Sequence, residues 1–415
     1  MKGQVEVAVA EAHEREWSRV VGTFVRSTRD LDLAEDAAQD AFVSAIDAWA
    51  RDGIPASPVA WLITAARRKA IDRQRRETNP LRKLPLLIVP GDDDVLPPDE
   101  IPDEHLRLIF TCCHPALAIK VRVALTLRLV CGLETATIAR LFVVPLPTMA
   151  ARITRAKKKS AISGIAYRVP EAHELPKRLP AVFSVVYLLF TAGHTAPSGD
   201  RLVQPELTRW ALDLASIMAQ FMPEEPEVLG LFGLLRLSDA RREARVDSKG
   251  HLVLVERQDR LRWDHAAIQE GIVAVESSLV RTRGRLPGRY APQAAIEAVH
   301  SEALGYEETD WQQLLCLYNL LREVAPSPIV EMNRAVIVSK LSGPDAGLAI
   351  LDDLTDWDAG KHYYLFAAAR ADLLRRLGRV AEANAEYRRA LALTDNGIEQ
   401  GFLPERIGET DMAGA

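Results

Sequence analysis

A run of prolines and carboxylates divides the N-terminal part of the chain into two helix-patterned segments. Residues 92–104 carry Asp and Glu but no Lys or Arg, and prolines recur from Pro85 to Pro102. Proline does not continue a helix and like charges repel one another, so this composition is typical of an extended linker. The sequence therefore predicts a first segment at residues 8–79, a linker at 80–102 and a second segment at 103–168.

The first segment has the spacing of an amphipathic helix followed by a basic one. Asp32 and Glu35 have the spacing of a capping box, which predicts a helix that begins at Asp32. One apolar stripe then recurs every three or four positions: Ala34, Ala37, Ala38, Ala41, Phe42, Ala45 and Trp49. Gly53 and two prolines break the chain, and a second helix is predicted over Trp61–Arg76. Its many Arg and Lys side chains cannot all be buried.

The second segment has the pattern of a helix-turn-helix. A helix is predicted over Lys120–Leu129, with Gly132 ending it, and Thr135 can cap the next helix. A short turn with two prolines intervenes, and a basic helix is predicted from about Thr148 through the run MAARITRAKKK. Two short helices joined by a turn, the second one basic, favour DNA binding in the major groove.

Charge is distributed unevenly along the chain. The formal net charge is −5 over 415 residues, so any nucleic-acid surface must come from local clusters. The two basic clusters lie at the ends of the two segments, with the acidic linker between them. Either cluster alone is explained equally well as a solvated helix face. Two clusters, one of them on a helix-turn-helix, favour binding of DNA phosphates.

The remaining chain, residues 170–405, is rich in Leu and Ala and predicts further helices. We place a helical domain at 170–290 and tetratricopeptide (TPR)-like repeats at 291–405. Leu377-Gly378, Tyr387 and Ala390-Leu391 match the second half of a TPR unit, and a weaker copy lies about 35 residues upstream. The predicted fold class is all-α: two small helical DNA-binding domains followed by a helical, TPR-like extension.

These patterns resemble the RNA polymerase sigma factors of the sigma-70 family, in the extracytoplasmic-function (ECF) subgroup. DLAEDAAQDAFVSAIDAW (Asp32–Trp49) is similar to sigma region 2.2, and WLITAARRKAIDRQRR (Trp61–Arg76) to regions 2.3 and 2.4. Residues Leu106–Lys159 resemble region 4, and the extension resembles that of one ECF subgroup with TPR-like repeats. The resemblance implies no catalysis. It implies binding to core RNA polymerase, at the β′ clamp helices and the β flap, and to promoter DNA.

The resemblance also assigns roles to individual residues. In region 2.2, we expect contact with polymerase from Asp36, Gln39, Asp40 and Phe42, although Phe42 is equally well explained as core. The −10 element would be bound by Arg67, Arg68, Lys69 and Arg73, with loop Arg51–Val59 as a pocket wall. Trp61 either stacks on a base or belongs to the core. In region 4, the −35 element would be read or held by Thr148, Ala151, Arg152, Arg155, Lys157 and Lys158.

Other features limit the alternatives. Met1–Glu16 lacks the apolar core of a signal peptide, and the run Ala181–Ala192 is too short to span a bilayer. The four cysteines include no Cys-x-x-Cys pair, so we expect a reducing cytoplasm and a structural role for Cys112-Cys113-His114 in place of a metal site. No cofactor or catalytic motif is present.

Three functions compete at this point. The first is a sigma factor regulated in cis by its own extension. The second is a helix-turn-helix regulator that acts without polymerase and carries a protein-interaction domain. The third is an enzyme or scaffold built on the C-terminal repeats, for which a candidate polar cluster is Gln258, Asp259, Arg260, Trp263 and Asp264. The TPR-like region predicts a protein or peptide partner, with candidate groove residues Asn333, Arg334, Tyr363, Arg370 and Arg375.

Overall fold

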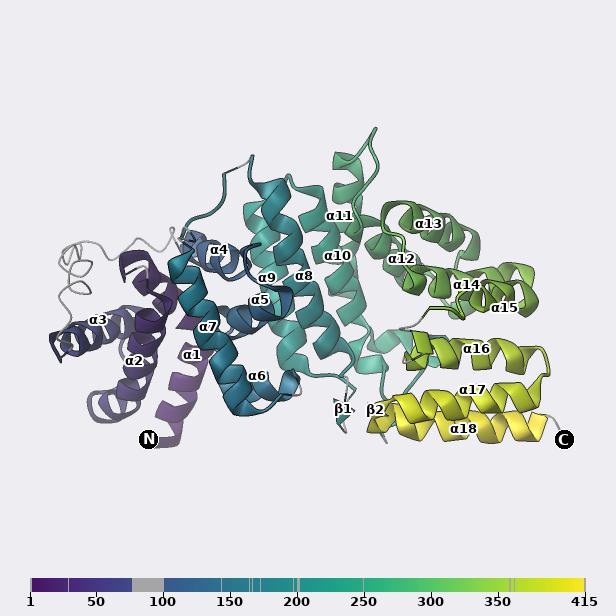
Figure 1. Ribbon diagram of the computed structural model, residues 1–415, viewed down its shortest axis with the longest axis horizontal. Helices are drawn as coiled ribbons and strands as arrows, with labels where there is room; N and C mark the ends of the chain where they lie inside the picture. Colours follow the sequence, from purple (N-terminus) through teal and green to yellow (C-terminus); the bar gives the residue numbers. More distant parts are fainter. Residues whose placement is uncertain are drawn as a thin grey trace. The chain divides into compact units, whose positions relative to one another are not determined.

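The structure is a computed structural model (Figure 1). It describes residues 2–28, 30–76 and 101–413, apart from positions 143, 164, 166, 172, 197, 200, 201, 249, 358, 359 and 362. The chain forms two compact units, Met1–Leu188 and Leu189–Ala415. Most of the predicted linker at 80–102 lies outside the described residues, and its last two residues begin a helix.

The N-terminal unit contains both predicted segments and is helical throughout its regular elements. These are α1 (Lys2–Thr28), α2 (Leu31–Asp52), α3 (Pro58–Arg76), α4 (Ile101–Cys112), α5 (Ile119–Leu125), the π-helix η4 (Thr126–Val130), α6 (Thr135–Leu141), α7 (Leu146–Ile162) and the first part of α8 (Leu175–His194).

The predicted apolar stripe of α2 is buried, but the helix begins one residue earlier than predicted. Asp30 is the N-cap, and its carboxylate accepts hydrogen bonds from the backbone N–H groups of Asp32 and Leu33 at 2.9 and 3.1 Å. The capping-box prediction for Asp32 is therefore wrong, and Glu35 is free for the buried ion pair described below. Gly53, with φ of 87°, ends the helix in a conformation that L side chains rarely adopt.

The second segment folds as α4 to α7, with α6 and α7 forming the helix-turn-helix. The helix predicted over Lys120–Leu129 is present, but its second half widens into the π-helix η4. The predicted turn prolines lie at the start of α7: Pro145 is the N-cap residue and Pro147 lies in the first turn, where proline needs no backbone N–H. Met149 and Ile153 bury one face of α7, which leaves the opposite face to solvent.

The C-terminal unit consists mainly of helices. Its regular elements are the last part of α8, β1 (Ser198–Gly199), α9 (Pro205–Phe221), α10 (Pro226–Ala240), η5 (Arg242–Ala244), η6 (Val255–Arg257), η7 (Arg260–Arg262), α11 (His265–Arg281), α12 (Tyr290–Glu302), η8 (Tyr306–Glu308), α13 (Trp311–Val324), α14 (Pro328–Ser342), α15 (Pro344–Asp352), α16 (Tyr364–Arg376), α17 (Val380–Leu393), β2 (Asp395–Asn396) and α18 (Gly397–Ala413).

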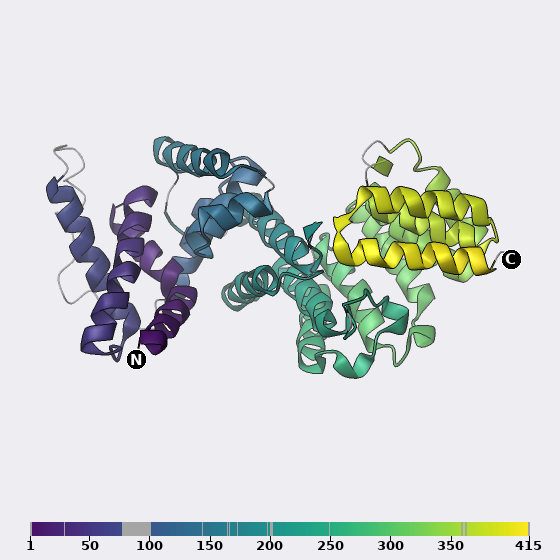
Figure 2. The same ribbon diagram turned by 90° about the horizontal axis from the view of Figure 1, so that it is seen from below.

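Helices α12 to α18 pack in order along the chain, each against the next, which is consistent with the TPR-like pattern. Three hydrophobic clusters follow one another and share helices: one joins α12, α13 and α14, the next joins α14 to α17, and the last joins α16, α17 and α18. Figures 1 and 2 show α17 and α18 lying side by side at the C-terminal end. Gly378, with φ of 73°, makes the turn between α16 and α17. Each helix therefore packs on its neighbours, as in a solenoid.

The all-α prediction is confirmed. Among the described residues, β structure amounts to the two-residue parallel pairing of β1 with β2 and one isolated bridge, Val246 with Leu252. Helix α8 is long and apolar enough to cross a membrane by length and composition alone. Four apolar side chains of this helix are buried within the protein, as they are in the core helices of soluble proteins: Val182, Val185, Val186 and Leu189.

Candidate nucleic-acid interface

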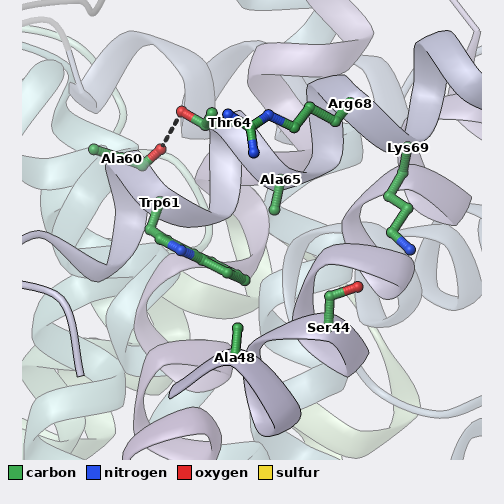
Figure 3. Close-up of a pocket in the computed structure, with 8 residues that line it drawn as sticks. All are labelled: Ser44, Ala48, Ala60, Trp61, Thr64, Ala65, Arg68 and Lys69. Atoms are coloured by element: carbon green, nitrogen blue, oxygen red, sulfur yellow. Dashed lines mark hydrogen bonds between the residues drawn. The ribbon is translucent and has the colours of Figure 1, made fainter. Parts of the chain in front are cut away.

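A pocket lies between α2 and α3, at the place where the sequence predicts the −10 contacts. Its volume is about 520 Å³. Figure 3 shows the lining residues, which are Ser44 and Ala48 from α2 and Ala60, Trp61, Thr64, Ala65, Arg68 and Lys69 from α3. The pocket therefore combines one aromatic ring, small side chains and two cations.

Trp61 is half-buried, so it is neither wholly core nor wholly exposed. Its ring packs edge-on against Trp49, with the ring centroids 5.8 Å apart, and it also lines the pocket. Arg68 and Lys69 are exposed, and Figure 3 shows the Lys69 side chain extending toward Ser44. An aromatic ring beside two cations is the combination that holds an unstacked base and its backbone phosphates.

Arg67, another predicted −10 residue, is half-buried on α3 and does not line this pocket. Arg73 lies in α3, but its side chain is outside the described residues. The structure therefore brings together Arg68 and Lys69 from the predicted set with Trp61, the residue predicted either to stack on a base or to belong to the core, and adds Thr64.

Helix α7 presents an outward stripe of the predicted −35 residues. Thr148, Ala151, Arg155 and Lys158 are all exposed, and their spacing of three and four residues places them on one face of the helix. The Arg152 guanidinium lies 5.8 Å from the centre of the ring of Phe142, the residue that follows α6, so this cation packs partly against that ring. A basic stripe on the second helix of a helix-turn-helix is suited to a DNA groove.

Lys157 does not belong to this stripe, and in this conformation its side chain is not available for the predicted phosphate contact. Its side chain is buried, and its ammonium lies 2.8 Å from the Asp32 carboxylate and also pairs with Glu35. Burial alone lowers the pKa of Lys157, but the two carboxylates outweigh it and hold that pKa above its ordinary value.

On α2, the residues predicted to contact polymerase divide into two groups. Gln39 and Asp40 are exposed and Asp36 is half-buried. Phe42 is 5% exposed and packs against the rings of His13 and Trp17, with centroids 5.0 and 5.9 Å away. Of its two interpretations, the geometry matches core, so direct contact of Phe42 with a partner is not supported.

The sequence reasoning missed two apolar residues on the outer face of α2. Val43 is 65% exposed and Ile46 is also exposed, close to Gln39 and Asp40 along the helix. Neither belongs to the buried stripe, so a helical projection would have marked them as apolar residues on the polar face. Exposed apolar side chains beside carboxylates are typical of a docking surface.

The adjacent Cys112 and Cys113 of the second segment are packing residues. Cys112 and Cys113 are buried, and the Cys113 sulfur lies 3.5 Å from the Thr126 hydroxyl oxygen. Burial raises the pKa of the Cys113 thiol to about 11 and raises that of Cys112 well above its ordinary value. Both thiols are therefore protonated at neutral pH, which makes them poor nucleophiles.

The three arginines among the candidate groove residues of the extension are engaged in ion pairs. Arg334 pairs with Glu331 at 2.9 Å, Arg375 pairs with Asp372 at 2.6 Å, and Arg370 contacts Asp352. The polar cluster at 258–264 is similarly structural. Asp264 caps α11, and Arg260 donates to the backbone oxygens of His300 and Ala303.

Comparison with family models and known proteins agrees with this geometry. Residues 10–79 match the model for sigma-70 region 2, and residues 107–159 match that for sigma-70 region 4. Residues 178–279 match a family of unknown function, DUF6596. No solved structure matches the chain.

Relatives cover both the whole chain and its N-terminal part. An uncharacterized protein of Rhizobium meliloti (strain 1021) is 38% identical over 97% of this chain and 94% of its own length. The ECF RNA polymerase sigma factor SigK of Mycobacterium bovis (strain BCG / Pasteur 1173P2) is 29% identical over 36% of this chain and 82% of its own length. SigK of Mycobacterium sp. (strain KMS) is 39% identical over 17% of this chain and 37% of its own.

A helical unit with both sigma regions in order, followed by a TPR-like helical region, defines a class of transcription initiation factor. The chain belongs to the sigma-70 family, in the ECF subgroup, and carries a C-terminal extension. In this chain, region 2 comprises α1–α3, region 4 comprises α4–α7, and the extension begins with α8.

Proposed function

We propose that this sigma factor binds core RNA polymerase through the outer face of α2 and directs initiation at promoters that α3 and α7 recognise. The observation that carries the proposal is the pairing of two distinct basic surfaces: the aromatic pocket of region 2 and the outward stripe of region 4. The extension regulates this activity in cis.

Polymerase binding is assigned to a mixed apolar and acidic surface. Val43 and Ile46 supply exposed apolar area, and Gln39 and Asp40 supply polar contacts beside them. Apolar contact supplies affinity, while carboxylates select a basic partner surface and steer its approach. The β′ clamp helices are the expected partner of this face, and region 4 is expected to contact the β flap.

The pocket of region 2 is assigned to the −10 element as a single strand. A base that leaves the stack can lie against Trp61, while Arg68 and Lys69 neutralise the neighbouring phosphates. This arrangement stabilises opened DNA by binding alone, without any chemical step. The α7 stripe is assigned to the −35 element as a duplex, with Arg155 at a phosphate or guanine edge.

The test is binding of the purified chain to core polymerase, followed by run-off transcription from a library of upstream regions. We expect holoenzyme formation and initiation from a restricted set of promoters that share −35 and −10 sequences. A double variant, Val43→Ser with Ile46→Ser, should weaken core binding, while Val7→Ser, which alters an exposed valine of α1, should not. DNA binding without core binding would instead support a helix-turn-helix regulator that acts without polymerase.

Regulation by the extension rests on a contact between its first helix and region 4. Arg178 of α8 donates a 2.7 Å hydrogen bond to the backbone oxygen of Phe110, and its guanidinium lies 6.0 Å from the centre of that ring. A change in the extension can therefore reach α4 through α8. We expect that Arg178→Met, and truncation after Pro170, each change transcription from the identified promoter by threefold or more (about 0.7 kcal/mol). If both variants keep their fold by circular dichroism and leave transcription unchanged, regulation by this route is excluded.

A further inference from the structure

A buried tryptophan of the extension lies beside the guanidinium groups of two arginines. Trp263, which directly follows η7, is only 4% exposed. The Arg260 guanidinium lies 4.3 Å from the centre of its ring, and the Arg241 guanidinium lies 5.8 Å from it. Arg241 directly follows α10 and Arg260 begins η7, so two separate elements bring their cations to one ring. These three residues, here called the Trp263 cluster, all belong to the C-terminal unit.

Contacts with α12 fix both guanidinium groups of the Trp263 cluster. Arg260 Nη1 donates to the backbone oxygens of His300 and Ala303 at 2.9 and 2.7 Å. Arg241 Nη2 donates to the carboxylate of Glu297, in the same helix. These structural contacts use only part of each guanidinium group, so other nitrogen atoms of both arginines remain.

Three nitrogen atoms of the Trp263 cluster are buried and have no hydrogen-bond partner among the described residues. They are Nε of Arg241, Nη2 of Arg260 and Nε1 of Trp263. Guanidinium and indole nitrogens donate hydrogen bonds but do not accept them, so only an acceptor can satisfy these atoms. Leaving a buried donor unpaired is unfavourable, and native proteins almost always supply a partner. The partner here must therefore come from solvent or from a ligand.

The charge of the cluster favours an anion over water as that partner. Arg241 is compensated by Glu297, whereas Arg260 makes no ion pair with any described residue. Burial and the neighbouring Arg241 lower the pKa of Arg260, although Glu308 opposes the shift, so the positive charge of Arg260 is incompletely compensated. Water accepts hydrogen bonds but brings no charge, whereas an oxyanion accepts hydrogen bonds and also neutralises a cation.

We propose that the Trp263 cluster binds the oxyanion group of a small molecule, either a phosphate or a carboxylate. Guanidinium groups match both anions in geometry and charge, and the indole N–H of Trp263 supplies a further donor beside them. Arg260 is half-buried and its neighbours Asp259 and Leu261 are exposed, so an anion can approach the cluster from solvent. The extension thereby gains a small-molecule site, in addition to the protein or peptide partner that its TPR-like helices predict.

The test follows the indole N–H of Trp263 by nuclear magnetic resonance in the full-length protein. Labelling with ¹⁵N-tryptophan gives one indole signal for each of the seven tryptophans, and the variant Trp263→Phe identifies the signal of Trp263 by its loss. Inorganic phosphate and acetate are titrated separately, with chloride keeping the ionic strength constant. We expect the proton signal of Trp263 to move downfield and to saturate, because a hydrogen bond to an anion deshields the proton.

The two anions distinguish the two chemical sources of the ligand. A shift with phosphate alone assigns the site to a phosphate group, and a shift with acetate alone assigns it to a carboxylate. A shift with both shows a site that accepts either oxyanion. Each of these results supports the proposal, since each shows that an anion accepts a hydrogen bond from the buried indole.

Two variants test whether the unpaired donors bind the anion. Calorimetric titration of Arg260→Gln and of Trp263→Phe should show an affinity lower by at least about tenfold in each, because each loses a hydrogen bond to a charged group. Arg257→Gln, which alters an exposed arginine of η6, is the matched control and should keep the wild-type affinity. Melting temperatures report whether Arg260→Gln disturbs the packing on α12. In that case Trp263→Phe, which retains an aromatic ring, decides the comparison.

Three outcomes would overturn the proposal. The first is a Trp263 signal that stays in place at about 100 mM of either anion, a concentration that saturates a site of millimolar affinity. The second is an equal shift on addition of chloride alone. The third is wild-type affinity in both Arg260→Gln and Trp263→Phe. All of these measurements use the free chain, so their result is independent of polymerase binding and promoter recognition.

Discussion

Helices α3 and α7 are both rich in Arg and Lys but use their cations differently. In α3, Arg68 and Lys69 are exposed at the edge of a pocket that contains Trp61. In α7, Arg155 and Lys158 are exposed, whereas Lys157 between them is buried against carboxylates of α2. A basic run therefore indicates where DNA binds, but not which of its cations are free to bind it.

The largest expected effect is on the aromatic half of the α3 pocket. Trp61→Ala should lower affinity for the single-stranded −10 sequence in holoenzyme by about 5- to 150-fold, because stacking of one base on an aromatic ring contributes about 1–3 kcal/mol. Trp61→Tyr should retain most of the affinity. Fluorescence anisotropy with a labelled strand measures the affinity of each variant. If Trp61→Ala lowers thermal stability but leaves strand binding unchanged, then Trp61 acts only in packing against Trp49.

The cations of the same pocket should appear in the salt dependence of binding. For Arg68→Ala with Lys69→Ala, the slope of log affinity against log salt for the single strand should decrease in magnitude by about 1.4, since each phosphate contact contributes about 0.7. Arg15→Ala, which removes an exposed cation of α1, is the control and should leave the slope unchanged. An unchanged slope in the double variant would remove these two residues from the DNA interface.

Two neighbouring lysines of α7, one exposed and one buried, test whether only the exposed cations of this helix contribute to DNA binding. Lys158→Ala should reduce the magnitude of the salt slope for a −35 duplex by about 0.9, because it removes one exposed cation from the outward stripe. Lys157→Ala should leave that slope unreduced and should instead lower the melting temperature. The comparison between the two helices would fail if the two variants gave equal losses of slope.

The smallest effect is expected from pH over the neutral range. The pKa of Lys157 lies above its usual 10.5 in the folded protein, where its partners outweigh the effect of burial. Its contribution to stability is therefore fully present below about pH 10.5 and is lost as the pH rises through the higher folded-state value. The difference in melting temperature between the wild type and Lys157→Met should be constant from about pH 7 to 9 and should shrink only at strongly alkaline pH. A difference that disappears by pH 9 would contradict the ion pairing.

Periodicity within one helix was enough to predict much of the fold. The stripe from Ala34 to Trp49 is the buried face of α2, and the match at Leu377-Gly378 marks the turn between two stacked helices. The spacing of Thr148, Ala151 and Arg155 likewise identified the outward face of α7. These features depend on neighbours three or four positions away, which the sequence contains directly.

Contacts between distant parts of the chain were not predictable in the same way. Asp32 and Glu35 have the spacing of a capping box, yet Glu35 pairs with Arg128, 93 residues away, and Asp30 caps the helix. Lys157 was indistinguishable from its neighbours because its partner Asp32 lies 125 residues earlier. Prediction of the pocket would also have required knowledge of how α2 packs against α3, because this packing places Ser44 and Ala48 opposite Trp61.

The separation of the two faces of α7 has a consequence for protein engineering. Met149, Ile153 and Ala156 anchor the helix, while Thr148, Ala151, Arg155 and Lys158 make no contribution to its buried face. The four outward positions can therefore be randomised as a library without altering the packing that holds the helix in place. On the proposed assignment of α7 to the −35 element, selection from such a library should yield variants that recognise new −35 sequences, and hence a set of promoters that work independently of one another in the same cell.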